Sequence, residues 1–325
     1  MIRFISAVGA ALLISPSAWA APDYPSRSIS IIVGFAPGGT TDTLARLVAT
    51  NLGEKLKQTV VVENASGAGG LIGMQKLKNA APDGYTLVFN NNSLAILPQL
   101  HPNANYDPIK EVEPIGIVAN VPMVLSVSNK SGIKDLPGML KQMRSGKEKI
   151  NLGSGGPGST AHLAEAMFLH LSKTQGELIQ YRGTGPALTD LMSGMIDGVI
   201  DQTVTMLPLH KDGRIKAIAV SGPNRITQAP DIPTFAEGGL PEFDLTIWNG
   251  LVAPKGTPPE VIAKLEKALN EVIDTPAFQD RLAQLAAQSP DAGARGAKAF
   301  SAVLSRDIEV ISVLAKQADL LGGAK

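Results

Sequence analysis

Two series of hydrophobic runs alternate with amphipathic segments along the chain. The first run, ISIIVGF at Ile29–Phe35, is rich in β-branched residues and stops just before Pro37, as a buried strand does. Apolar residues then recur at helical spacing over Leu44–Leu52. Two further strand-like runs follow at Thr59–Asn64 and Tyr85–Asn92, with a glycine-rich turn and a helical segment between them. The first hundred residues therefore predict the order β-α-β-α-β, which is typical of a parallel sheet.

A second series of the same kind occupies the middle of the chain, and a helical tail follows it. The middle series begins with the strand-like run VPMVLSVS at Val121–Ser128, and its later strands lie in KINLGS, ELIQ, MIDGVIDQ and IKAIAVSG. After LTIWNGLVAP, helices are predicted over Pro259–Thr275, Pro276–Gln288 and Ala297–Gln317. No long linker separates the two series, so we expect two α/β domains that lie against each other.

The N-terminus has the pattern of a secretory signal peptide. Arg3 precedes an apolar run at Phe4–Ile14, and Ala18–Ala20 forms an A-x-A cleavage box before Pro22. The alternative is a membrane anchor, but the apolar run has only about half the length that a spanning helix needs. We expect cleavage after Ala20 and export of the mature chain.

The composition narrows the classes of function. Lys and Arg together number 29, as do Asp and Glu, so the chain offers no basic field for nucleic acid or a membrane surface. Cys is absent and His numbers four, so neither a metal site nor a cofactor that needs thiolates is expected. The aromatic content of 4% argues against recognition of sugars by stacking.

Four glycine-rich turns lie between a predicted strand and a predicted helix. In each, free backbone N–H groups and the positive end of the helix dipole form a potential anion site. Thr40 or Thr41 is predicted to cap the first of these helices, with Asp42 in its first turn, and Thr184 to cap the last. The turns are Ala36–Thr41, Ala65–Gly70, Gly153–Thr160 and Gly183–Gly185.

Two enzyme interpretations compete with simple anion binding. The spacing of Gly153, Gly155 and Gly158 matches the G-x-G-x-x-G dinucleotide fingerprint, although an exported protein rarely meets free NAD. A serine hydrolase would need G-x-S-x-G, which neither Ser66 nor Ser154 fits. No turn is followed by G-K-[ST], so a P-loop is excluded.

Several single residues near these turns have two interpretations each. His162 is a ligand contact or an ordinary helix residue, and Asp201 is a ligand contact or a helix cap. Arg182 pairs with an anion or is solvated. Asn91, in the run Asn90–Asn92, lines a cleft or caps a helix.

The ordered set of motifs resembles the Bug (Bordetella uptake gene) family, the solute receptors of tripartite tricarboxylate transporters. The motifs are YPSRSISIIVGFAPGGTTDTLAR, VVVENASGAGGLIG, APDGYTLVF, LGSGGPGSTAHLAEAMF, QYRGTGPALTDLMSGMIDGVIDQ, AIAVSGPNR, DIPTFAEGGLPEF and WNGLVAPKGTP. They run from Tyr24 to about Pro258 and are specific as a set.

The resemblance implies a two-lobed periplasmic binding protein of the Venus-flytrap kind, with a mostly parallel sheet in each lobe. It implies a small organic carboxylate as ligand, a membrane permease as partner, no cofactor and no catalysis. We expect a monomer with lobe one at 21–122 and 235–325 and lobe two at 123–234. The alternative is a receptor that presents the carboxylate to the ectodomain of a sensor kinase.

Ligand contacts are implied by the motifs that match, residue by residue. Gln202 departs from the Ser or Asn that is commoner at its position, which leaves the identity of the ligand open. The implied contacts, with Asn91 and Arg182 added from their positions, are Phe35, Ala36, Pro37, Gly38, Gly39, Thr40, Asp42, Ala65, Ser66, Gly67, Ala68, Gly69, Asn91, Ser154, Gly155, Ser159, Thr160, His162, Arg182 and Asp201.

Overall fold

The computed structural model describes residues 24–147 and 149–317. The predicted signal peptide, residues 1–20, lies outside this range. Within the described residues, no helix combines the length and the apolar character that crossing a bilayer would require.

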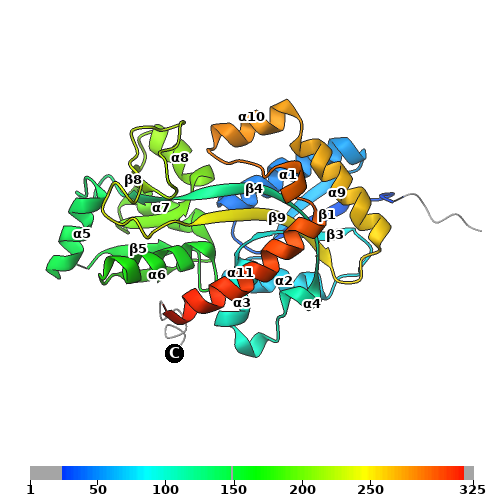
Figure 1. The fold of residues 1–325 in the computed structure, drawn as a ribbon, viewed down its shortest axis with the longest axis horizontal. Helices are drawn as coiled ribbons and strands as arrows, with labels where there is room; N and C mark the ends of the chain where they lie inside the picture. Colours follow the sequence, from blue (N-terminus) through cyan, green and yellow to red (C-terminus); the bar gives the residue numbers. More distant parts are fainter. Residues whose placement is uncertain (1–23, 148, 318–325) are drawn as a thin grey trace, which may run out of the picture.

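One half of the molecule, here called lobe one, is built on the first three strands (Figure 1). β1 (Ile29–Val33) lies between β2 (Val60–Asn64) and β3 (Thr86–Asn91), and both pairings are parallel. β9 (Thr246–Pro254) then pairs antiparallel with β3, and β4 (Val112–Val127) pairs antiparallel with β9. The sheet of lobe one is therefore mixed, because β9 enters it from the other half of the molecule.

Helices cover both faces of this sheet. Alternation along β1 directs Ile31 toward one hydrophobic cluster and Ile32 toward another, and both are fully buried. The first cluster is completed by α1 (Thr40–Leu56), α9 (Pro259–Ile273) and α10 (Pro276–Gln284). The second is completed by α2 (Leu71–Lys78), α3 (Ser93–Leu100) and α11 (Ala297–Gln317), and the short helix α4 (Pro108–Glu111) leads into β4.

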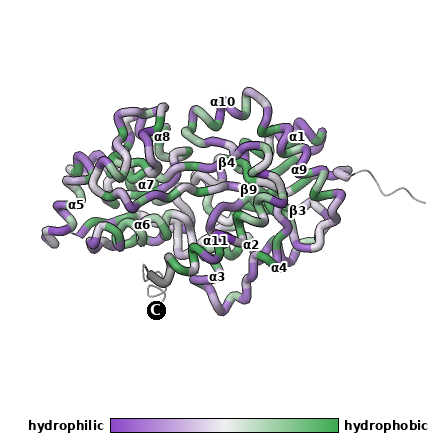
Figure 2. The backbone as a smooth tube through the Cα atoms, in the orientation of Figure 1, coloured by the Kyte–Doolittle hydropathy of each residue, from purple (hydrophilic) through white to green (hydrophobic). Residues whose placement is uncertain are grey.

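The other half, lobe two, repeats the arrangement. β5 (Asn151–Ser154) pairs parallel with β6 (Glu177–Gln180) and with β7 (Gly198–Gln202), while β4 pairs antiparallel with β7 and with β8 (Lys216–Val220). Its helices are α5 (Leu136–Ser145), α6 (Thr160–Ser172), α7 (Thr184–Ser193) and α8 (Thr203–Lys211). Figure 2 shows hydrophobic stretches around the central strands and hydrophilic ones in the outer turns.

The lobes are joined by β4 and β9, which run side by side through the middle of the molecule (Figure 1). The partner of β4 changes between Pro122, which pairs with Thr246 of β9, and Met123, which pairs with Gln202 of β7. Two irregularities interrupt the register of β4, one of them next to Pro114. Pro114 is tolerated because β4 is the edge strand of the lobe-one sheet at that point.

The chain therefore has the two-lobed fold of periplasmic binding proteins. The strands read from the sequence in the first hundred residues and the three helices of the tail are confirmed, apart from small shifts of their ends. The expected parallel pairing is present in each lobe, where β1 pairs with β2 and β3, and β5 pairs with β6 and β7. Antiparallel strands complete each sheet: β9 and β4 in lobe one, and β4 and β8 in lobe two.

Candidate ligand-binding cleft

The glycine-rich turns of both lobes meet at one small cavity between the lobes. Four helices begin at this cavity: α1 of lobe one and α6, α7 and α8 of lobe two. The free backbone N–H groups at these helix starts concentrate positive electrostatic potential at the cavity. The loop before α3 also reaches the cavity, through Asn91. The lining residues are Phe35, Gly39, Thr40, Thr41, Asn91, Ser159, Thr160, Thr184, Asp201 and Gln202.

Lobe one contributes the bare N-terminus of α1. Gly39 is the N-cap residue, with φ −85° and ψ 172°, and it offers no side chain to the N–H groups of the first turn. Thr40 and Thr41 are the first two helical residues, and both are buried. The Asn91 side chain, which lines the cavity, donates a hydrogen bond of 3.1 Å to Thr41 Oγ1. It also accepts one of 3.0 Å from the N–H of Ser93, the first residue of α3, whose N-cap residue is Asn92.

Lobe two contributes three helix starts. Ser159 is the N-cap residue of α6, and its hydroxyl accepts a hydrogen bond of 3.1 Å from the His162 N–H. Gly183 is the N-cap residue of α7, so Thr184 is its first helical residue. Asp201 is the last residue but one of β7, directly before Gln202, which ends the strand and is the N-cap residue of α8.

The predicted capping roles of Thr40, Thr41 and Thr184 are wrong. In both helices a glycine occupies the N-cap position and the threonines follow inside the helix. Their hydroxyls are therefore free to line the cavity, and the Thr40 hydroxyl lies 3.2 Å from that of Thr205 in α8. Sequence analysis missed Thr41, Thr184 and Gln202 as lining residues. The signal for Thr41 and Thr184 is their place just after the glycines of a strand-to-helix turn, and the signal for Gln202 is its place at the end of a strand.

Asp201 is the one acidic side chain among the lining residues, all of which belong to the described chain. It is only 2% exposed, and burial raises the pKa of its carboxyl to about 6. Hydrogen bonds from the hydroxyls of Thr205, Thr184 and Thr40 and from the Gln202 backbone oppose this shift. The carboxyl is therefore ionised near neutral pH and is surrounded by donors from both lobes.

Asp42 holds the first two loops of lobe one together, rather than lining the cavity. Its carboxylate accepts hydrogen bonds from the Gly38 N–H at 3.1 Å, from Arg46 Nε and Nη2, and from Asn64 Nδ2 at 2.8 Å. Asn64 also donates to the carbonyl of Phe35 at 3.0 Å. Burial opposes ionisation of Asp42, but the bonds from Arg46, Asn64 and Gly38 outweigh it and hold its pKa below the usual range.

The second loop, containing Ala65, Ser66, Gly67, Ala68 and Gly69, lies beside the cavity without lining it. A Cβ atom at Gly69 would come within 2.1 Å of the Pro157 carbonyl oxygen, so this loop contacts the glycine-rich turn before α6. Gly158 of that turn lies in the same contact, close to Leu97 of α3. The G-x-G-x-x-G segment therefore packs against the opposite lobe.

The lobes also meet on the other side of the cavity. The Ala36 N–H donates a hydrogen bond of 3.0 Å to the carbonyl of Arg182. Arg182 is an exposed residue, and it takes part in this hydrogen bond through its backbone carbonyl. Ala36, Pro37 and Gly38 line the outer mouth of this seam together with residues of α7.

This closed arrangement leaves a cavity of about 20 Å³. That is close to the space that one water molecule needs, about 10–15 Å³. A ligand therefore has access only when the lobes separate at the β4–β9 hinge.

Three predicted residues lie behind the cavity wall. Gly155 lies against Ser159, and the Ser154 hydroxyl is buried without a hydrogen-bond partner among the described residues. His162 is 9% exposed, and burial lowers its pKa, so its ring is neutral near pH 7. Beside them lies Glu165 of α6, which sequence analysis missed. It is fully buried, and within the described residues neither oxygen has a partner with hydrogen-bond geometry.

Burial raises the pKa of Glu165 well above its usual range, and the charge of Asp201 raises it further. The Ser154 side chain and the Ile200 backbone favour its ionised form only in part. Burial therefore favours the protonated form of Glu165.

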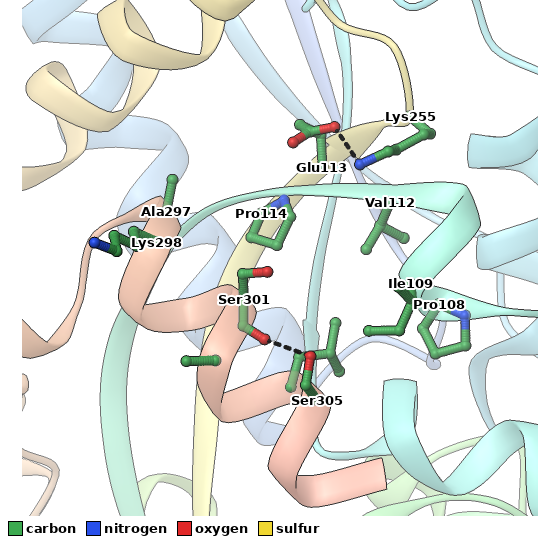
Figure 3. Close-up of a pocket in the computed structure, with 12 residues that line it drawn as sticks. Pro108, Ile109, Val112, Glu113, Pro114, Lys255, Ala297, Lys298, Ser301 and Ser305 are labelled. Atoms are coloured by element: carbon green, nitrogen blue, oxygen red, sulfur yellow. Dashed lines mark hydrogen bonds and ion pairs between the residues drawn. The ribbon is translucent and has the colours of Figure 1, made fainter.

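A second candidate site is a groove of about 520 Å³ on lobe one, between α4, the start of β4 and α11 (Figure 3). Glu113 and Lys255 form an ion pair of 2.9 Å at its rim, and Ser305 donates to the Ser301 carbonyl. Its charged groups are already paired or exposed. None of its lining residues in the described chain belongs to the glycine-rich turns that meet at the cleft.

The chain is similar to several known proteins. The family model of the tripartite tricarboxylate transporter receptors matches residues 44–303. Protein BugT of Bordetella pertussis is 35% identical over 289 residues, which cover 87% of this chain and 88% of BugT.

Two solved structures are similar along nearly their whole length. The periplasmic binding protein BugD superposes with a TM-score of 0.87 at 34% identity, covering 91% of this chain and 99% of BugD. MatC from Rhodopseudomonas palustris, solved with bound malate, superposes with a TM-score of 0.85 at 32% identity, covering 90% and 99% of the two chains.

Proposed function

The chain belongs to the family of tripartite tricarboxylate transporter receptors, and we propose that it is a periplasmic receptor that captures a small organic carboxylate and delivers it to a membrane permease. Its relatives are periplasmic binding proteins rather than enzymes, and one of them binds malate. We extend this to the present chain as a binding protein without catalysis that acts as a monomer.

The observation that carries the proposal is the convergence of four helix starts on a single inter-lobe cavity. The uncapped N–H groups of α1 are suited to one carboxylate of the ligand. Neutral amides hold an anion more reversibly than a buried arginine fork would, which suits a receptor that must release its ligand. We assign lobe one to 21–122 and 235–325 and lobe two to 123–234.

The cycle follows from the two lobes. The ligand carboxylate binds the N-terminus of α1 while the cleft is open, and closure then adds the contacts of α6, α7 and α8. Closure is favoured because these contacts exist only when both lobes surround the ligand. The family assignment favours delivery to a permease over the alternative of a sensor-kinase ectodomain.

A thermal-shift screen of mono-, di- and tricarboxylates tests the proposal. A ligand at about 100 times its dissociation constant stabilises the folded state by roughly 2.7 kcal/mol. We expect at least one carboxylate to raise the melting temperature and NAD to leave it unchanged. A shift with NAD and with no carboxylate would favour the dinucleotide interpretation instead.

A further inference from the structure

We propose that the ligand is a small monocarboxylate whose far end carries a hydrogen-bond donor, a hydroxyl or an ammonium group, which Asp201 receives. This inference rests on the proposed function and specifies the class of carboxylate. It follows from the different chemistry of the two ends of the cavity.

The lobe-one end accepts negative charge. The first N–H groups of α1 have no partners within the helix, and the N-cap residue, Gly39, has no side chain to satisfy them. Thr40, Thr41 and Asn91 add only neutral groups to this end. It is the part of the cavity where a carboxylate is electrostatically favoured.

The lobe-two end also has helix N-termini, those of α6, α7 and α8, but it differs from the lobe-one end because it holds the carboxylate of Asp201. This carboxylate is 2% exposed and accepts a hydrogen bond of 2.9 Å from Thr205 Oγ1. Thr184 of α7 and Thr40 of α1 also present their hydroxyls to it. Every group that faces Asp201 from these helices is therefore a donor, and a ligand group that replaces one of them must also donate.

No cation lies at this end to balance a second carboxylate. The ten residues that line the cavity include no Lys, Arg or His in the described chain. Of the basic residues discussed above, Arg46 binds Asp42, Arg182 is exposed, and His162 lies outside the cavity lining. A dianionic ligand would thus place its second carboxylate beside Asp201, where like charges repel in a buried site.

The surroundings of Asp201 also disfavour a second carboxylate on the ligand. Glu165 of α6 lies close enough to interact with the charge of Asp201, and it is fully buried without a hydrogen-bond partner among the described residues. The wall behind the cavity therefore holds a second acid, Glu165, and a histidine, His162, whose pKa is lowered by burial so that it carries no compensating positive charge. A further carboxylate would add a third acidic group to a region that is closed to solvent.

Matched ligand series test the proposal by titration calorimetry on the mature protein at pH 7.5. Each series keeps one chain length and changes only the far group: 4-hydroxybutyrate, 4-aminobutyrate, butyrate and succinate, with the corresponding three-carbon and five-carbon sets. In the series that fits, we expect the hydroxyl or ammonium member to bind about tenfold or more tightly than the dicarboxylate.

The variant Asp201→Asn should abolish or reverse this preference, because the amide accepts less strongly and carries no charge. Asp212→Asn is the matched control, since it removes the same charge from an exposed position of lobe two. A wild-type protein that binds the dicarboxylate most tightly would overturn the inference, as would an unchanged ranking in Asp201→Asn. If Asp201→Asn fails to fold, the wild-type ranking alone decides. Failure of every carboxylate to bind would instead remove the proposed function itself.

Discussion

A Cβ atom added to Gly185 in lobe two would lie 2.2 Å from the carbonyl oxygen of Pro37 in lobe one. The two lobes approach so closely at this point that only a glycine fits. Gly185 is the second residue of α7, where alanine is a better helix former than glycine, so the substitution should not weaken lobe two itself.

Gly185→Ala should therefore oppose closure and weaken the binding of every carboxylate by about tenfold or more, since the closed state carries part of the affinity. Calorimetry and the melting temperature of the ligand-free protein check this. The control is Gly293→Ala, because a Cβ atom there meets nothing within 4 Å. Equal affinity in both variants would show that binding does not need full closure.

Gly39→Val should abolish carboxylate binding while the fold survives. The position tolerates a Cβ atom, whose nearest neighbours are at 3.8–3.9 Å in Thr184 and Gly185 of the other lobe. The additional methyl groups of valine would enter a cavity of about 20 Å³. Gly39→Ala is the matched control and should retain measurable binding. Wild-type affinity in Gly39→Val would exclude the first loop from the site.

Asp42→Ala should lower both stability and affinity, because it releases Gly38 and Asn64 from one carboxylate. We expect a loss of about 1–3 kcal/mol in the free energy of unfolding, measured by urea denaturation. Asp83→Ala, which removes an exposed ion pair with Arg27, should cost less than about 1 kcal/mol.

The pKa of Asp42 is lowered in the folded protein, so the ionised carboxylate stabilises the fold. This stabilisation is fully present above the unfolded pKa of about 3.9 and is lost as the pH falls through the folded pKa. The difference between wild type and Asp42→Ala should therefore shrink in acid. A difference that stays constant down to acid unfolding would contradict the role given to this carboxylate.

The titration of Asp201 should change the stability with pH in the direction opposite to that of Asp42. Its pKa is raised to about 6, so the folded protein holds the proton more tightly than the unfolded chain does. The free energy of unfolding then falls as the pH rises from about 3.9 to 6, and this contribution is constant above that window.

Melting temperatures at pH 4 to 8 should show a decline of wild type relative to Asp201→Asn within this window. The groups that face Asp201 are Glu165 of α6 and the hydroxyls of Thr40, Thr184 and Thr205. Asp212→Asn should run parallel to wild type. A pH-independent offset between wild type and Asp201→Asn would show that Asp201 titrates as an ordinary carboxyl.

The exported protein should begin at Ala21, because the A-x-A box and Pro22 place the cleavage after Ala20. Mass spectrometry of protein from the periplasm of a Gram-negative host measures this directly. A membrane-attached product that retains residues 1–20 would contradict the periplasmic assignment.

Most strands of the fold could be predicted because their signal is local. ISIIV, VVVEN and TLVFNN are short apolar runs that end at glycine, asparagine or proline, and the structure has them as β1, β2 and β3. The start of β4 was missed, since Val112–Asn120 contains Pro114 and Gly116 and has no regular alternation. Those residues are accommodated by an edge position and by bulges, which depend on the neighbouring strand β9.

The alternation of strands and helices, the family and the glycine-rich turns can be inferred from the amino-acid sequence alone. They follow from periodicity and from residue types that act on their nearest neighbours in the chain. Which residues of those turns face the cavity depends on the packing of the folded chain. This packing brings Thr40 next to Thr205 and Asp201, sets Asp42 in a network within lobe one, and places Glu165 behind the cavity wall. Such relationships depend on how two lobes, far apart in sequence, are packed across the β4–β9 hinge, and no local pattern records that packing.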